Sequence, residues 1–95
     1  MFYDGKGVTK NLNKALEWLI KAALQGDAIA QTLLGDHYAA TKDEVRAYAW
    51  LNLAAANGDS KVVQQRDELE KQLTAEQKAE AQKLSAELFA KMPKK

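Results

Sequence analysis

The sequence repeats itself at an offset of 32 residues, and this repeat constrains the fold more than any other feature. The segment from Ala15 to Asp27 aligns with the segment from Ala47 to Asp59, and seven of the thirteen aligned positions are identical. A period between about 20 and 50 residues is typical of solenoids, in which each unit covers the apolar face of its neighbour. The repeat therefore predicts an all-α chain built from stacked helix-turn-helix units.

The identical positions follow a helical period. Counted from Ala15, the apolar residues stand at i, i+3, i+4, i+7 and i+8, which places them on one stripe of a helix. The tryptophan of each unit supplies bulk, and the alanines let a neighbouring helix approach closely. We therefore expect both tryptophans to be core residues in equivalent positions. The residues with a predicted structural role in the repeat are Ala15, Trp18, Ala22, Ala23, Gly26, Ala47, Trp50, Ala54, Ala55 and Gly58.

Residues that start and stop helices divide the chain into five predicted helices. Gly26 and Gly58 are suited to end a helix, because glycine adopts the left-handed conformation at no steric cost, and the aspartate after each can cap the next helix. Two further starts have the capping-box pattern. The first two expected helices cover residues 12–25, capped by Asn11, and residues 28–39, capped by Asp27. The third begins at the box Thr41–Glu44 and ends at Asn57, and the fourth runs from Asp59 or Ser60 to about Leu73. The last begins at the box Thr74–Gln77 and is ended by Pro93.

These helices predict a single module over residues 1–95. It divides into a first unit at residues 1–26, a second unit at residues 27–58, and a third helix pair with a C-terminal cap at residues 59–92. The last helix has apolar residues spaced to cover one side, as the capping helix of a repeat array does. Those residues are Ala79, Ala81, Leu84, Leu88 and Phe89.

Charge and cysteine content exclude several classes of function. The 95 residues include 14 Lys plus Arg and 13 Asp plus Glu, a net charge of +1, which does not favour a nucleic-acid partner. No apolar run approaches the roughly 20 residues of a membrane-spanning helix, so we expect no membrane insertion. The absence of cysteine excludes disulfides and thiol catalysis. The compartment stays open between the cytoplasm and a periplasmic or secreted location after loss of an N-terminal segment.

No catalytic, metal-binding or cofactor-binding constellation is expected. His37 is the only histidine, and without cysteine one chain cannot assemble a metal site from several nitrogen or sulfur ligands. Asp27, Asp59 and Glu44 fall at predicted helix starts, where carboxylates compensate unpaired N–H groups. The segment Asp4-Gly5-Lys6-Gly7 lacks the pattern of a phosphate loop and is interpreted as a turn between helices. The sequence thus indicates a protein that is not an enzyme.

Many positions fit one longer motif. It reads Tyr3-x-x-Gly-x-Gly7-Val8-x-x-Asn11-x-x-Lys14-Ala15-x-x-Trp18-x-x-Lys21-Ala22-Ala23-x-x-Gly26-x-Ala28-x-Ala30-Gln31-x-x-Leu34-Gly35-x-x-Tyr38. On this motif the chain resembles the Sel-one-like repeats, relatives of the tetratricopeptide repeats, from Tyr3 to about Gly58. The second unit departs from the pattern, because it has three residues fewer than the first between its tyrosine and its alanine and lacks the Gly-x-Gly-Val turn.

The resemblance implies an α/α right-handed superhelix that serves as an adaptor or scaffold, often in bacteria, with another protein or peptide as its partner. Some relatives that act on β-lactams carry a disulfide in each hairpin. Because this chain has no cysteine, it lacks the residues that form those disulfides, and the resemblance does not extend to that activity.

The surface opposite the repeat residues is the expected binding surface. Along residues 28–39 the repeat positions share one arc, and the large aliphatic residues Ile29 and Leu33 stand on the opposite arc. Aliphatic residues on an open face indicate a binding surface, although packing of either against a neighbouring helix is equally compatible with the pattern. The candidate binding residues of this concave face are Ile29, Thr32, Leu33 and Asp36 and, one period later, Lys61, Gln64 and Glu68.

We therefore predict an interaction scaffold that docks a peptide or helix on its concave face. The alternative is a structural terminal cap or self-associating unit of a longer array. An apolar flank at Phe2, Tyr3, Leu16 and Leu19, left by a missing first helix, favours weak self-association. Exposure of Ile29 and Leu33 favours the scaffold, and burial favours the cap.

Overall fold

The chain is all-helical throughout the part that the structure describes. The computed structural model describes residues 5–56 and 60–92, with side chains from residue 13 onward. The helices are α1 (Gly5–Leu24), α2 (Ala28–Ala40), α3 (Glu44–Ala55), α4 (Ser60–Glu70) and α5 (Ala75–Ala90). The described residues contain no strand, so the all-α prediction is confirmed.

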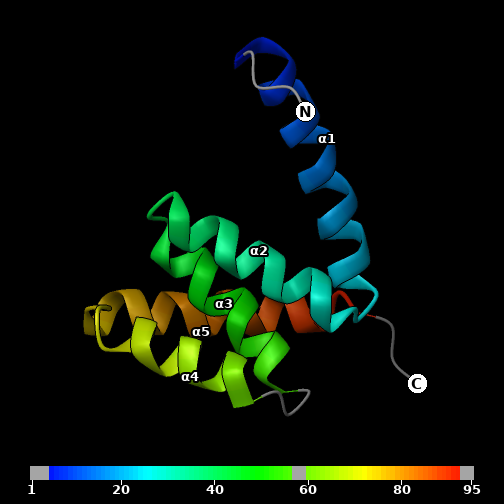
Figure 1. Cartoon of the computed structure of the whole chain (residues 1–95). Helices are drawn as coiled ribbons and strands as arrows, with labels where there is room; N and C mark the ends of the chain where they lie inside the picture. The colour runs from blue at the N-terminus through cyan, green and yellow to red at the C-terminus, as the bar shows by residue number, and fades with distance from the viewer. Residues whose placement is uncertain (1–4, 57–59, 93–95) are drawn as a thin grey trace.

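Helix α3 is the centre of the molecule. It packs against α2, α4 and α5, whereas α1 packs mainly against α2 and extends away from the other helices (Figure 1). Eight of the twelve residues of α3 are buried, among them Trp50 and Leu51. A helix that is apolar on nearly every side is stable only inside a core. The fold therefore surrounds α3 and leaves α1 at the margin.

A glycine sets the distance between α2 and α3. A Cβ atom added to Gly35 would lie 2.6 Å from Leu51 Cδ2, closer than non-bonded carbon atoms approach. Gly35 is buried, and so is Leu51. The two helices can therefore pack this closely only because residue 35 has no side chain.

Several predicted helix ends are confirmed. The Asp27 side chain accepts hydrogen bonds from the backbone N–H groups of Ile29 and Ala30, at 2.9 and 3.1 Å. Gly26 has φ of 97°, the left-handed conformation expected after α1. The capping box between Thr74 and Gln77 is complete, since each side chain bonds the other residue's backbone N–H.

The predicted capping box at residues 41–44 is wrong. The residue that caps α3 is Asp43, whose side chain accepts from the backbone N–H of Arg46 at 3.3 Å, and Thr41 instead closes α2. Thr41 donates its hydroxyl proton to the Tyr38 carbonyl oxygen. The reason is Lys42, whose φ of 65° reverses the chain between the two helices and leaves Asp43 as the first residue that can cap.

Other predicted boundaries also differ. Helix α1 begins at Gly5 rather than Leu12, so neither the cap at Asn11 nor the turn at Gly5-Lys6-Gly7 is found. A glycine inside a helix lowers the stability of the helix by about 1 kcal/mol relative to alanine but does not end it, and the residues that follow Gly5 and Gly7 are helical. Helix α3 ends two residues before Asn57, and α4 ends three residues before Leu73. The predicted roles of Gly58, Asp59, Pro93, Phe2 and Tyr3 lie outside the described residues.

The two tryptophans do not have equivalent surroundings, and the prediction of a buried Trp18 is wrong. Trp50 is 3% exposed, whereas Trp18 is 70% exposed. Helices α2, α4 and α5 surround the helix that holds Trp50, while α2 is the main neighbour of the helix that holds Trp18. The side of α1 that includes Trp18 therefore has solvent where α3 has a helix.

The other repeat residues follow the same division. Ala23 is buried and Ala22 is half-buried, but Ala15 is exposed, because it lies on the uncovered side of α1. In the second unit the predicted core residues Ala47, Trp50, Ala54 and Ala55 are all buried. Of the apolar residues expected on one side of α5, Ala81 and Leu88 are buried and Leu84 is half-buried, but Ala79 and Phe89 are exposed.

Candidate functional site

Two hollows run in line between α2 and α4, over α3, and together form what we call the α2–α4 groove. The larger hollow has a volume of about 710 Å³ and the smaller of about 190 Å³. The larger is lined by Asp36, Ala39, Glu44, Leu51, Lys61, Gln64, Gln65, Glu68, Leu69 and Gln72, and the smaller by Ala28, Ile29, Thr32, Leu33, Ala54 and Val62. Each hollow draws residues from α2, α3 and α4, so the three helices form one continuous surface.

All seven residues of the predicted concave face line this groove. Ile29, Thr32 and Leu33 line the smaller hollow, and Asp36, Lys61, Gln64 and Glu68 line the larger one. Ile29 is 73% exposed and Leu33 is 47% exposed, as the scaffold interpretation expects. The sequence therefore located a real surface feature. The binding role of these residues stays a prediction.

The sequence analysis missed several residues that line the groove, and extending the helical stripe along residues 61–72 would have identified two of them. Positions 61, 64, 65, 68 and 72 recur at i, i+3, i+4, i+7 and i+11, the spacing of one helix face in the sequence, although α4 ends at Glu70 and Gln72 lies in the turn after it. Gln65 and Gln72 complete that stripe, and both line the larger hollow. Gln65 also spans the groove, because its Nε2 donates a hydrogen bond to Asp36 Oδ1 at 3.1 Å. This bond links α4 directly to α2.

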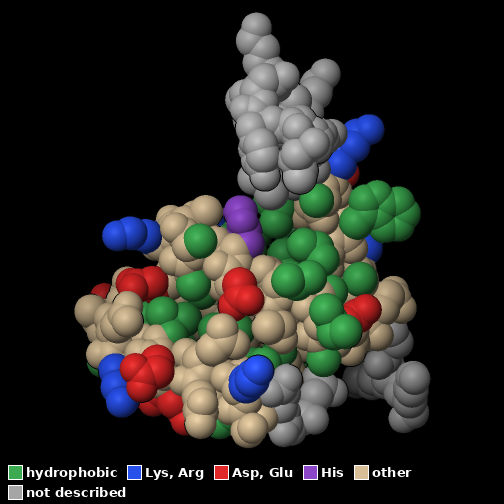
Figure 2. Space-filling view, in the orientation of Figure 1, with side chains coloured by type: hydrophobic (Ala, Val, Ile, Leu, Met, Phe, Trp, Pro, Cys, Tyr) green, Lys and Arg blue, Asp and Glu red, His purple; other side chains and the backbone are tan. Residues whose placement is uncertain are grey.

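The groove is apolar at one end and acidic at the other. The smaller hollow is lined by aliphatic side chains together with Thr32. The larger contains three carboxylates, from Asp36, Glu44 and Glu68, against one ammonium group, from Lys61. Figure 2 shows the face with α2 and α4, where hydrophobic side chains gather over the start of α2 and acidic side chains lie further along, over the middle of α2 and over the far part of α4. The chain as a whole has a net charge of +1, so negative charge is concentrated here.

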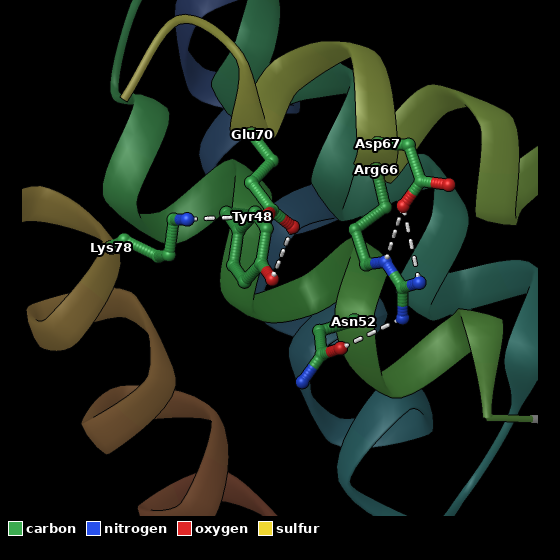
Figure 3. A network of polar contacts seen from close by, with 6 residues as sticks. All are labelled: Tyr48, Asn52, Arg66, Asp67, Glu70 and Lys78. Carbon is green, nitrogen blue, oxygen red and sulfur yellow. Dashed lines mark hydrogen bonds and ion pairs between the residues drawn. The ribbon is translucent and has the colours of Figure 1, made fainter. Parts of the chain in front are cut away.

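A network of polar contacts fixes the position of α4 against α3 and α5 (Figure 3). The Tyr48 hydroxyl donates to Glu70 Oε1 at 3.1 Å, and Lys78 Nζ lies 3.2 Å from Glu70 Oε2. Arg66 Nη1 donates to Asn52 Oδ1 at 3.1 Å. None of these residues lines the groove, so the network holds the α4 wall from the other side.

The network shifts the pKa of two of its members. Burial raises the pKa of the Tyr48 hydroxyl, and its hydrogen bond to Glu70 adds to that rise. The hydrogen bond from Lys78 lowers the pKa of the Glu70 carboxyl, and the hydrogen bond from Tyr48 lowers it further. Both shifts favour the protonation states at neutral pH that make the contacts. At neutral pH Tyr48 is therefore a donor and Glu70 an acceptor, as these contacts require.

A family model supplies the relationship of this chain to known proteins. The model of the Sel1 repeat matches residues 1–27 and again residues 28–59. The chain belongs to the Sel1 repeat family. The resemblance drawn from the motif is thereby confirmed. No curated protein and no solved structure matches the chain.

Family membership narrows what the groove can do. Sel1 repeats generally mediate protein–protein interactions, and the repeat is a non-catalytic interaction repeat. His37 is half-buried, with its ring 5.1 Å from the Tyr38 ring, centroid to centroid. Within residues 5–56 and 60–92, no group of three or more metal-ligating side chains is close enough to hold an ion, and no helix is long and apolar enough to cross a membrane. The groove offers contact surface, with apolar and charged groups in fixed positions.

Proposed function

We propose that this Sel1 chain is a non-catalytic scaffold that docks a peptide or helix of a partner protein in the α2–α4 groove. One observation carries the proposal: Ile29 and Leu33 expose large aliphatic side chains beside a hollow. Exposed apolar side chains that cluster at a groove are typical of protein-interaction sites, whereas scattered ones need no explanation. Family membership supports the same class of function.

The test compares capture of partner proteins by matched variants. The purified chain and the double variant Ile29→Lys, Leu33→Lys are immobilised and exposed to the same cell extract. The control is the double variant Trp18→Lys, Phe89→Lys, which replaces the other large hydrophobic residues that are exposed within the described part of the chain. We expect the control to retain the proteins that the wild-type chain captures and the groove variant to lose them.

Folding must be measured beside capture. All four side chains are exposed, and surface substitutions usually change stability by less than about 0.5 kcal/mol, but Trp18 buries about a third of its surface and its replacement should cost about 1 kcal/mol. Circular dichroism should therefore show that both double variants are folded, with the control variant melting at a somewhat lower temperature than the groove variant. Loss of capture by the control variant alone, or equal capture by all three proteins, contradicts the proposal.

A second candidate function, self-association, is favoured by Trp18. The equivalent residue Trp50 is buried, so Trp18 belongs to a stripe of residues that packs against other helices in α3 but is exposed in α1. Lys21 Nζ lies 5.6 Å from the centre of the Trp18 ring and covers only part of it. Sedimentation over a wide concentration range tests this function. Concentration-dependent dimers that Trp18→Lys abolishes support it, and a monomer at every concentration rules it out.

A further inference from the structure

The groove has two properties that together restrict what fits it, namely its width and its charge. Gln65 on α4 bonds Asp36 on α2 at 3.1 Å, so side chains of the two helices touch across the groove. A helix with its side chains is about 10 to 12 Å wide and cannot sink between α2 and α4 at that level. An extended chain can lie over the bridge.

The length of the groove agrees with an extended chain. Helix α2 has 13 residues, so it runs for about 20 Å at 1.5 Å per residue. About six extended residues, at about 3.3 Å each, cover that distance. Ile29 and Asp36 are seven residues apart on α2, which is about 10 Å along its axis. Three residues of an extended chain span the same interval.

The charges specify the second property of the occupant. Asp36 and Glu68 occupy equivalent positions 32 residues apart in consecutive units, and both line the larger hollow. Glu44 adds a third carboxylate on the wall formed by α3. Glu68 is paired with Lys71 at 3.4 Å, but both side chains are more than 70% exposed, and such pairs contribute little. The acidic end therefore attracts a cation in a bound segment.

We infer that the partner segment is an extended peptide with an aliphatic residue and, three residues away, an arginine or lysine. The aliphatic side chain lies against Ile29 and Leu33, and the cation lies in the larger hollow, which Asp36, Glu44 and Glu68 line. This inference rests on the proposed function, because it names the chemistry of the segment that occupies the same groove. An acidic segment is repelled by the same carboxylates.

Two synthetic peptides test the inference. Each has eight residues in a Ser/Gly background with one leucine; the first has an arginine three residues after the leucine, and the second has a glutamate there. Binding to the whole chain is followed by fluorescence anisotropy at low and high salt. We expect the arginine peptide to bind about tenfold more tightly at low salt, because several weak charge pairs act together, and the difference to shrink at high salt.

A pair of charge reversals locates the effect. Glu68→Lys changes a groove carboxylate, and Glu80→Lys makes the same change in net charge on the exposed surface of α5. Glu68→Lys should weaken binding of the arginine peptide about three- to tenfold, and Glu80→Lys should leave it within about twofold. An equal loss in both variants overturns the inference, because the attraction then comes from net charge alone.

The remaining outcomes separate the inference from the function on which it rests. If the two peptides bind equally well and Ile29→Lys, Leu33→Lys abolishes both, the charge preference is wrong and the groove is still the docking site. If neither peptide binds while the wild-type chain captures proteins through the groove, the extended segment with this spacing is wrong. If capture also survives the groove variant, the proposed function itself fails.

Discussion

The unequal burial of the two tryptophans gives the sharpest test of the fold. Trp50 and Trp18 share one repeat position, yet Trp50 is 3% exposed and Trp18 is 70% exposed. A buried tryptophan covers about 150 to 250 Å². Tryptophan-to-alanine changes in cores, in which lost burial and the cavity act together, typically cost about 3 to 5 kcal/mol, and Trp50→Ala should lower the free energy of unfolding by that amount. Trp18 buries about a third of its surface, so Trp18→Ala should cost about 1 kcal/mol.

Thermal denaturation followed by circular dichroism distinguishes these values. In a domain of this size 1 kcal/mol shifts the melting temperature by about 4 to 8 °C, so Trp50→Ala should melt at least about 12 °C lower and Trp18→Ala less than about 8 °C lower. Fluorescence gives an independent check, since Trp18→Phe leaves only the buried indole and Trp50→Phe only the exposed one. Acrylamide should quench the second variant far more strongly. Equal melting temperatures and equal quenching would falsify the arrangement of α1.

Two further predictions concern packing and pH. Gly35→Ala should lower the melting temperature, with a loss of about 1 to 3 kcal/mol from the collision with Leu51; a rise, which helix propensity alone favours by about 1 kcal/mol, would show that α2 and α3 are not in such close contact. The pKa of the Glu70 carboxyl is lowered in the folded chain. Its contribution to stability is therefore present above its pKa in the unfolded chain, near 4.5, and is lost as the pH falls through the lower pKa of the folded chain. The melting temperature should fall as the pH drops below about 4.5, and less so in Glu70→Gln; identical pH profiles would exclude this contribution.

Local signals in the sequence predicted the start of a helix correctly where only one nearby residue could cap it. Asp27 follows a glycine and precedes an apolar helix, and its side chain caps α2 as expected. The Thr74 box is equally isolated, and it forms. At residues 41–44 two caps competed, because Thr41 and Asp43 both stand before the helix. The left-handed Lys42 decides between them, and no local propensity of a lysine predicts that conformation.

Burial could not be read from the repeat, because it depends on neighbours rather than on the residue itself. Ala15 and Trp18 are identical to Ala47 and Trp50, yet the first pair is exposed and the second is buried. The identical residues indicate that the two helices have the same stripe of residues suited to packing. They do not indicate whether another helix of the described chain packs against that stripe. The same reason explains Phe89, which the pattern placed on the covered side of α5 and which is 66% exposed.

The groove is lined by equivalent positions of two repeat units, and the side chains at some of these positions differ between the units. Equivalent positions of the two units face each other across it. Two of the four pairs differ in character, Ile29 with Lys61 and Leu33 with Gln65, whereas Thr32 and Gln64 are both neutral and polar, and Asp36 and Glu68 are both acidic.

The acidic pair, Asp36 and Glu68, places two carboxylates on the same hollow. Packing constrains the buried stripe to small and apolar residues in every unit, whereas nothing in the core constrains the outward positions. The outward positions can therefore change from unit to unit without loss of the fold. In this chain Ile29 and Leu33 make one end of the groove aliphatic, and the equivalent carboxylates Asp36 and Glu68 make the other end acidic.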